Sequence, residues 1–181
     1  PSSKFPDGGA CFWTIKPECK GQVIGGGYIF SYPLDIALTA DGSKGYVSNL
    51  SAACLFVVDF SIPSPAVKSQ INIPGASPTP TTMAFNPATK ELYVVDYNQG
   101  KLFFVNTRDD TIDPVGFSIG TSPQNVLVAP DGNKIYVTAG GLDKITIIDA
   151  ATRQAEATIP IGEDADPTGM TIAGKKLYVL G

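Results

Sequence analysis

Histidine is absent from the 181 residues, and its absence excludes several kinds of chemistry. Without histidine there is no Ser-His-Asp triad, no Cys-His pair, no histidine-ligated zinc and no imidazole pH switch. Charge is also scarce, because charged residues make up 17% of the chain and the net charge is −4. That acidic balance argues against nucleic-acid binding through a basic face. No apolar run is long enough for a membrane span, and no signal-peptide pattern opens the sequence.

Cysteine is rare as well, with Cys11, Cys19 and Cys54 only. An odd number leaves at least one thiol unpaired within a monomer, and no C-x-x-C motif occurs that would indicate a redox or zinc site. We expect the cysteines to be small buried residues and all three thiols to be free.

Two weaker signals concern the compartment. Asn49-Leu50-Ser51 is a sequon, which permits glycosylation at Asn49. The composition is poor in charge and rich in serine, threonine, glycine and proline, which favours an extracellular or cell-surface protein over a cytosolic one.

Apolar residues make up 43% of the chain, so it can bury the core of a single domain and is not disordered. The 19 glycines and 15 prolines indicate many turns. No stretch has a sustained helical period, whereas runs rich in valine, isoleucine, phenylalanine, tyrosine and threonine recur along the chain.

These runs belong to an internal repeat of four units. The prolines that open the units are 47, 43 and 44 residues apart, and the tyrosines of the next run are 47, 43 and 42 apart (Pro33, Pro80, Pro123, Pro167; Tyr46, Tyr93, Tyr136, Tyr178). A third run ends on a polar residue 13 positions after the tyrosine in three units, and a short fourth run ends in glycine. Four strands per unit at this period predict the blades of an all-β propeller.

The repeat resembles the YVTN β-propeller family. The resemblance rests on Lys134-Ile135-Tyr136-Val137-Thr138, on the Asp131-Gly132 turn before it, and on Ile147-Ile148-Asp149 and Ile159-Pro160-Ile161-Gly162 after it. The second unit departs from the pattern, with Val95-Asp96 after Tyr93-Val94. The resemblance implies the propeller fold and says little about function.

The fourth unit contains only two strands before the sequence ends. Residues 11–16 align with Cys54–Asp59 one 43-residue period earlier, and residues 22–27 fall where a fourth strand ends in glycine. We therefore predict one domain, 1–181, with four blades of four antiparallel strands at about 32–75, 76–120, 121–162, and 163–181 joined with 1–31. The alternative is a fragment of a propeller with six to eight blades.

Four equivalent positions, two residues after each opening proline, are predicted to line one channel mouth: Asp35, Thr82, Asn125 and Gly169. Oxygen ligands suit a hard cation, so Asp35 and Asn125 are candidate ligands for Ca²⁺ or a similar ion on the axis. The alternative is that these side chains only satisfy turns. Tyr28, Tyr32 and Asp166 are predicted to lie on the rim of the same mouth. The acidic cluster from Arg108 to Asp113 is expected only to be solvated in a turn of the opposite face.

Two kinds of function fit these observations. The first is a non-catalytic module that binds a small molecule, a glycan or a protein at the channel mouth, with no nucleic acid and no membrane span involved. The second is a propeller enzyme of the lactonase, isomerase or lyase kind, with mouth carboxylates such as Asp35 or an axial metal doing the chemistry. The missing histidine favours the first, and whether the chain is an enzyme stays open.

Overall fold

Antiparallel β-strands are the main secondary structure of the protein, a computed structural model that describes residues 32–50, 52–63 and 65–181. Within these ranges there is no α-helix, and one short 3-10 turn, η3, spans Gly140–Leu142. No helix of the described residues is long and apolar enough to cross a membrane.

The strands are grouped into four sheets, which we call the first to fourth blades. The first has the order β1 (Pro33–Leu38), β2 (Lys44–Asn49), β3 (Cys54–Asp59), β4 (Ala66–Asn72). The second contains β5 (Pro80–Asn86), β6 (Glu91–Asp96), β7 (Lys101–Asn106), β8 (Thr111–Ile112), β9 (Phe117–Ser118). The third contains β10 (Pro123–Val128), β11 (Lys134–Ala139), β12 (Lys144–Asp149), β13 (Ala155–Pro160), and the fourth β14 (Gly169–Ala173), β15 (Lys176–Leu180).

Local turn chemistry explains where the first two strands of a blade meet. In the first blade the Asp41 carboxylate accepts hydrogen bonds from the Thr39 hydroxyl and from Ser43 N. Gly42 supplies the positive φ of +69° that the turn requires. The third blade repeats the arrangement, with Asn133 N donating to Asp131 and Gly132 at φ +75°.

The fourth strand of the second blade is interrupted. β8 and β9 both pair with β7 but are separated by a turn at Asp113-Pro114-Val115-Gly116. Pro114 has no N–H for a ladder hydrogen bond, and Gly116 adopts φ +66°. This turn brings the Asp113 carboxylate to the outer edge of the blade.

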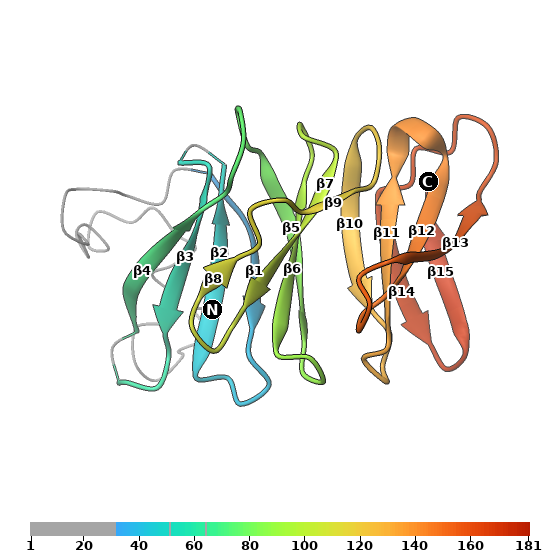
Figure 1. The fold of residues 1–181 in the computed structure, drawn as a ribbon. Coiled ribbons are helices and arrows are strands. Elements are labelled where there is room, and N and C mark those ends of the chain that lie inside the picture. Colours follow the sequence, from blue (N-terminus) through green and yellow to red (C-terminus); the bar gives the residue numbers. More distant parts are fainter. Residues whose placement is uncertain (1–31, 51, 64) are drawn as a thin grey trace, which may run out of the picture.

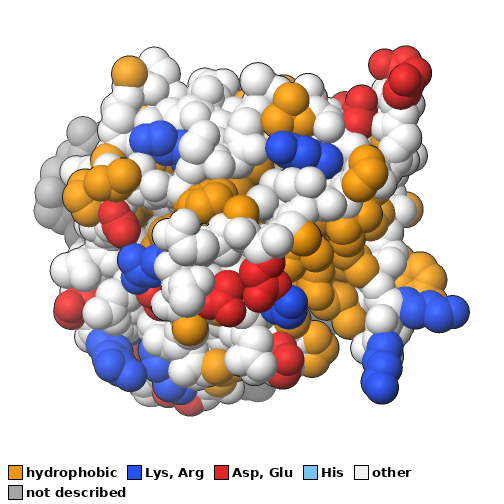
Figure 2. Space-filling view, turned by 45° about the vertical axis from the view of Figure 1, so that its right-hand side comes forward, with side chains coloured by type: hydrophobic (Ala, Val, Ile, Leu, Met, Phe, Trp, Pro, Cys, Tyr) orange, Lys and Arg blue, Asp and Glu red, His pale blue; other side chains and the backbone are white. Residues whose placement is uncertain are grey.

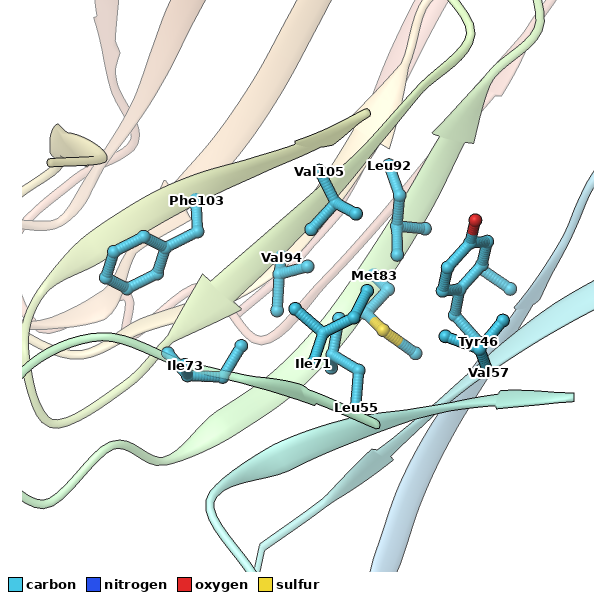
Figure 3. Packing of buried hydrophobic residues seen from close by; sticks show 11 residues of the cluster. Tyr46, Leu55, Val57, Ile71, Ile73, Met83, Leu92, Val94, Phe103 and Val105 are labelled. Atoms are coloured by element: carbon cyan, nitrogen blue, oxygen red, sulfur yellow. The ribbon is translucent and has the colours of Figure 1, made fainter. Parts of the chain in front are cut away.

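The blades stand side by side as a fan, with β1, β5, β10 and β14 adjacent in that order (Figure 1). Apolar faces fill the space between blades. Between the first and second, Tyr46, Leu55 and Val57 belong to one buried cluster with Met83 and Phe103 (Figure 3). Between the second and third, Tyr93 and Phe104 pack with Ile135 and Val137, and the Tyr93 and Phe104 rings meet edge to face. Burial of these faces holds the blades in line.

The prediction of an all-β propeller made of four-stranded blades is confirmed for the described residues. The fourth sheet has two described strands, and residues 1–31, which the sequence assigns to its outer half, lie outside the described part of the chain. Cys54 is buried with a free thiol at the start of β3, as expected, while Cys11 and Cys19 also lie outside that part.

Candidate binding site at the channel mouth

The inner strands begin at one end of the fan, and their first residues share an irregularity. In β1, β5 and β10 the register with the second strand shifts between the opening proline and the third residue after it: Pro33/Ile36, Pro80/Met83, Pro123/Val126. A bulge changes the direction in which the side chains within it point. The predicted mouth positions Asp35, Thr82 and Asn125 all lie in these bulges.

In two of the bulges, a hydroxyl group of the neighbouring strand accepts a hydrogen bond from a backbone N–H. Ser48 Oγ accepts from Asp35 N at 3.0 Å, and Thr138 Oγ1 accepts from Asn125 N at 2.8 Å. Ser48 and Thr138 are equivalent, each two residues after the repeat tyrosine, and both are fully buried. The small hydroxyl residue of the repeat motif therefore supports the mouth, a role that sequence reasoning missed although its recurrence was visible.

Asp35 joins the first blade to the second. Its Oδ1 accepts from Ile36 N at 2.8 Å, and its Oδ2 accepts from Met83 N at 2.7 Å. Burial raises the pKa of Asp35 above its ordinary value, while the hydrogen bonds from Met83 N and Ile36 N lower it by less. A half-buried carboxyl group with a raised pKa at a mouth can bind a ligand or transfer a proton.

The next two junctions use other groups. Thr82 Oγ1 donates to the Gln124 carbonyl in the third blade at 2.9 Å, and Gln124 Nε2 donates to Asp166 Oδ1 in the linker to the fourth blade at 3.1 Å. Asp35, Thr82, Gln124 and Asp166 thus form a row that connects all four blades, which we call the mouth row. Three of its members were predicted, but their described hydrogen bonds hold blades together.

Asn125 differs from its equivalents. Its backbone N–H is bound to Thr138, its side chain is half-buried, and its amide group makes no hydrogen bond among the described residues. The amide offers one acceptor and two donor hydrogens to a ligand. Gly169, the fourth equivalent position, has no side chain and lies against Leu180.

The three residues predicted to lie on the rim differ in their surroundings. Tyr32 is 72% exposed, and Tyr28 lies outside the described residues. Asp166 has φ +36°, and its N–H donates to Asp143 Oδ1, as Asp164 N does to Asp143 Oδ2. Asp143 was not among the predicted residues, because no local pattern indicates that it orders the linker about 20 residues later.

The axial cation stays a prediction. In the described part of the chain no group of three or more acidic, cysteine or histidine side chains is placed to hold a metal. Asp35 would enter such a site with each oxygen already accepting a backbone hydrogen bond. The Asn49 side chain is fully buried and its Oδ1 accepts from Ala52 N, an environment that argues against glycosylation of the folded chain there.

At the opposite end of the fan, the prediction for the acidic cluster is wrong. The cluster from Arg108 to Asp113 is not merely solvated, because Asp110 Oδ1 lies 2.9 Å from Lys44 Nζ of the first blade. Asp113 Oδ2 lies 3.1 Å from Arg153 Nη1 of the third blade, and Arg153 also pairs with Glu91. These carboxylates join neighbouring blades, which a sequence does not reveal because the partners are 40 or more residues apart.

Solved structures from three sources resemble this fan. Hydrazine synthase of Kuenenia stuttgartiensis matches with a TM-score of 0.72 and 23% identity, over 87% of this chain and 45% of that one. An inactive virginiamycin B lyase of Staphylococcus aureus with quinupristin matches with a TM-score of 0.69 and 13% identity, over 82% and 48%. The periplasmic gluconolactonase of Pseudomonas aeruginosa matches with a TM-score of 0.63 and 16% identity, over 84% and 43%.

The chain has a β-propeller fold. Identities this low show the fold alone, and the propeller described here spans less than half the length of these chains. No family model matches the sequence, and no curated protein does. Several of the similar propellers are named lactonases or lyases.

Proposed function

We propose that this propeller binds a small polar organic molecule at the channel mouth, with the Asn125 amide as its principal contact. The observation that carries the proposal is the contrast among three equivalent bulges. Asp35 and Thr82 bind the next blade through their side chains, whereas Asn125 has a half-buried amide without a hydrogen bond among the described residues. A polar group held in place by its backbone and left unbound is suited to orient a ligand.

The charge of the mouth narrows the ligand class. Asp35 and Asp166 are the charged members of the mouth row, and both are acidic. A phosphorylated or carboxylated ligand would be repelled here, so a neutral or cationic molecule fits better. Neutral sugar lactones are suitable probes, because one structurally similar protein is named a gluconolactonase.

Titration of the protein with D-glucono-1,5-lactone, followed by amide NMR, tests the binding proposal. Shifts confined to Asn125, Thr138 and their neighbours are expected, and Asn125→Ala should abolish them. Asn133→Ala is the matched control, because Asn133 lies in a hairpin turn at the opposite end of the same blade. Unchanged spectra with this lactone and a panel of other neutral ring compounds would contradict the proposal.

A second candidate function is hydrolysis of such a lactone with Asp35 as general base. Its support is the raised pKa of Asp35 together with the lactonases and lyases among the similar structures. In this scheme Asp35 takes a proton from a water molecule while the water oxygen attacks the carbonyl carbon of the lactone. The C–O bond of the ring then breaks, and the proton passes from Asp35 to the leaving oxygen.

The rate of acid release from the lactone distinguishes the two candidates. If Asp35 is the base, the wild-type protein accelerates hydrolysis over buffer and Asp35→Asn removes the acceleration. Asp35→Asn loses one of the two backbone hydrogen bonds, so its melting temperature is measured first to show that the variant is folded under the assay conditions. Binding without acceleration would leave the module as a binder only.

A further inference from the structure

The peptide unit between Gln124 and Asn125 is bound from two sides. Its carbonyl oxygen accepts a 2.9 Å hydrogen bond from Thr82 Oγ1 of the second blade, and its N–H donates a 2.8 Å hydrogen bond to Thr138 Oγ1 of the third. The carbonyl and the N–H point in opposite directions from one planar group, so the two bonds together fix the orientation of that plane. The Cα of Asn125 belongs to the same plane, and the base of its side chain is therefore fixed as well.

The equivalent peptide unit of the first blade is bound by a hydroxyl on one side. Asp35 N donates to Ser48 Oγ at 3.0 Å, whereas the Leu34 carbonyl accepts no side-chain hydrogen bond among the described residues. The Asp35 carboxylate makes the connection to the second blade instead, through Met83 N. In this blade the side chain of the mouth residue is therefore already occupied.

The second blade lacks the hydroxyl on the other side. Its Thr81 carbonyl accepts a 3.0 Å hydrogen bond from Ser48 Oγ of the first blade. Val95 stands where the neighbouring blades have Ser48 and Thr138, two residues after the repeat tyrosine, and valine has no hydroxyl to accept from Thr82 N. Of the three described bulges, only the third therefore has hydroxyl groups on both sides of its peptide unit, and the same bulge carries the unbound amide group.

A further hydrogen bond reaches the third bulge from the β13–β14 linker. Gln124 Nε2 donates to Asp166 Oδ1 at 3.1 Å, and Asp166 is exposed. Acidic side chains stand exposed at the upper right of Figure 2, the corner of the molecule at which Figure 1 shows this linker. Water competes with an exposed hydrogen bond, so this contact orients the bulge less firmly than the half-buried bond from Thr82 does.

We propose that Thr82 is a positioning residue for Asn125, so that the binding site is assembled by the second and third blades together. This inference rests on the proposed function, because it concerns the orientation of the amide group that binds the ligand there. A group that is oriented before the ligand arrives loses little conformational freedom on binding, which raises affinity. Without the Thr82 hydroxyl, the Gln124 carbonyl loses its donor and the Asn125 amide samples a wider range of directions.

NMR of the ligand-free protein tests the positioning step. Thr82→Val keeps the shape of the side chain without its hydroxyl, so the carbonyl carbon shift of Gln124 should move and the ¹⁵N heteronuclear NOE of the Asn125 side-chain amide should fall. Thr82→Ser retains the hydroxyl and should restore both signals. Thr81→Val is the matched control, because Thr81 is the adjacent half-buried threonine and its hydroxyl donates to the Val95 carbonyl of its own blade. An unchanged Asn125 amide signal in Thr82→Val overturns the proposal.

Titration with D-glucono-1,5-lactone extends the same comparison to binding. We expect Kd to rise about three- to tenfold in Thr82→Val and to stay within about twofold of the wild type in Thr82→Ser and Thr81→Val. Equal rises in the two valine variants would show a general effect of β5 on the blade and would overturn the positioning role. If the Thr82→Val variant does not fold, Thr82→Ala takes its place in both measurements.

The two measurements separate this inference from the proposed function. A wild-type protein that does not bind the lactone counts against the proposed function for this probe, while the Asn125 amide signal of the ligand-free variants still decides the role of Thr82. A lactone that binds at Asn125 with the same Kd in the wild type and in Thr82→Val supports the proposed function and overturns the positioning role.

Discussion

The hydroxyl of Tyr46 donates a 2.5 Å hydrogen bond to Asp110 Oδ1 across the junction between the first and second blades. Burial raises the pKa of Tyr46 above its ordinary value, with Asp110 adding to the shift, so the hydroxyl keeps its proton and stays a donor near neutral pH. The repeat tyrosine of the first unit therefore packs in the junction and also binds a carboxylate of the next blade.

Replacing Tyr46 by phenylalanine should therefore destabilise the protein. A hydrogen bond to a charged group contributes about 1.5–3 kcal/mol, and we expect a loss in that range by urea denaturation. Tyr136→Phe is the control, since the Tyr136 hydroxyl has no hydrogen bond in the described part of the chain and its removal should cost less than about 0.5 kcal/mol. Equal losses in the two variants would show that the Asp110 contact contributes nothing.

Thr138 gives a test of the bulge at Asn125. Thr138→Val keeps the shape of the side chain but leaves Asn125 N–H without its acceptor, so we expect a loss of about 1–3 kcal/mol. Thr138→Ser retains the hydroxyl and should therefore keep most of the stability that the valine variant loses. If the valine variant is as stable as the serine variant in denaturant titrations, the hydroxyl does not support the mouth.

Gly→Ala at two equivalent positions compares the cost of backbone strain alone with the cost of strain plus steric crowding. Gly42→Ala has only the positive φ to overcome, because the space that the new Cβ would occupy is open, and should cost about 1–2 kcal/mol. Gly132→Ala has the same φ problem, and its Cβ would lie 2.6 Å from Ala88 Cβ and 2.8 Å from Asn86 Oδ1 of the second blade. The second variant should be clearly less stable, and equal melting temperatures would refute this contact between blades.

The lowered pKa of Asp59 should make the stability of the fold depend on pH in the acidic range. Lys68 and Ser61 hold the pKa of Asp59 at about 2, below its ordinary 3.8, with the Lys68 contact the largest cause. The unfolded chain then binds the proton more readily, so the stabilisation is present above about pH 4 and disappears as the pH falls to about 2. Asp59→Asn should lower the melting temperature at pH 6 and converge with the wild type near pH 2. Parallel curves would contradict this assignment.

Cys54 should be unreactive in the folded protein. Its thiol is buried, and burial raises its pKa to about 11, so little thiolate forms near neutral pH. Iodoacetamide at pH 8 should label the Cys54 peptide only after a denaturant is added, as mass spectrometry can measure. Rapid labelling of that peptide in buffer would show that β3 opens frequently.

The parts of the fold that could be predicted are those encoded over short distances. Asp41-Gly42 specifies a turn locally, and the recurring tyrosine run around Tyr46 specifies a strand, so blade positions followed from spacing. Contacts between blades could not be predicted in the same way. Met83 N reaches the Asp35 carboxylate from 48 residues away, and nothing in either local sequence indicates that the bulge aims one at the other.

The ion pairs at the end opposite the mouth have a consequence for how a repetitive chain avoids misassembly. Lys44 and Glu91 occupy equivalent positions, as do Asp110 and Arg153, so the two junctions carry the same contact with the charges reversed. A blade that docked one place out of order would set Lys44 against Arg153 or Glu91 against Asp110, and like charges would repel. Units that fold alike are thereby made non-interchangeable, which discourages the exchange of blades between neighbouring chains during synthesis.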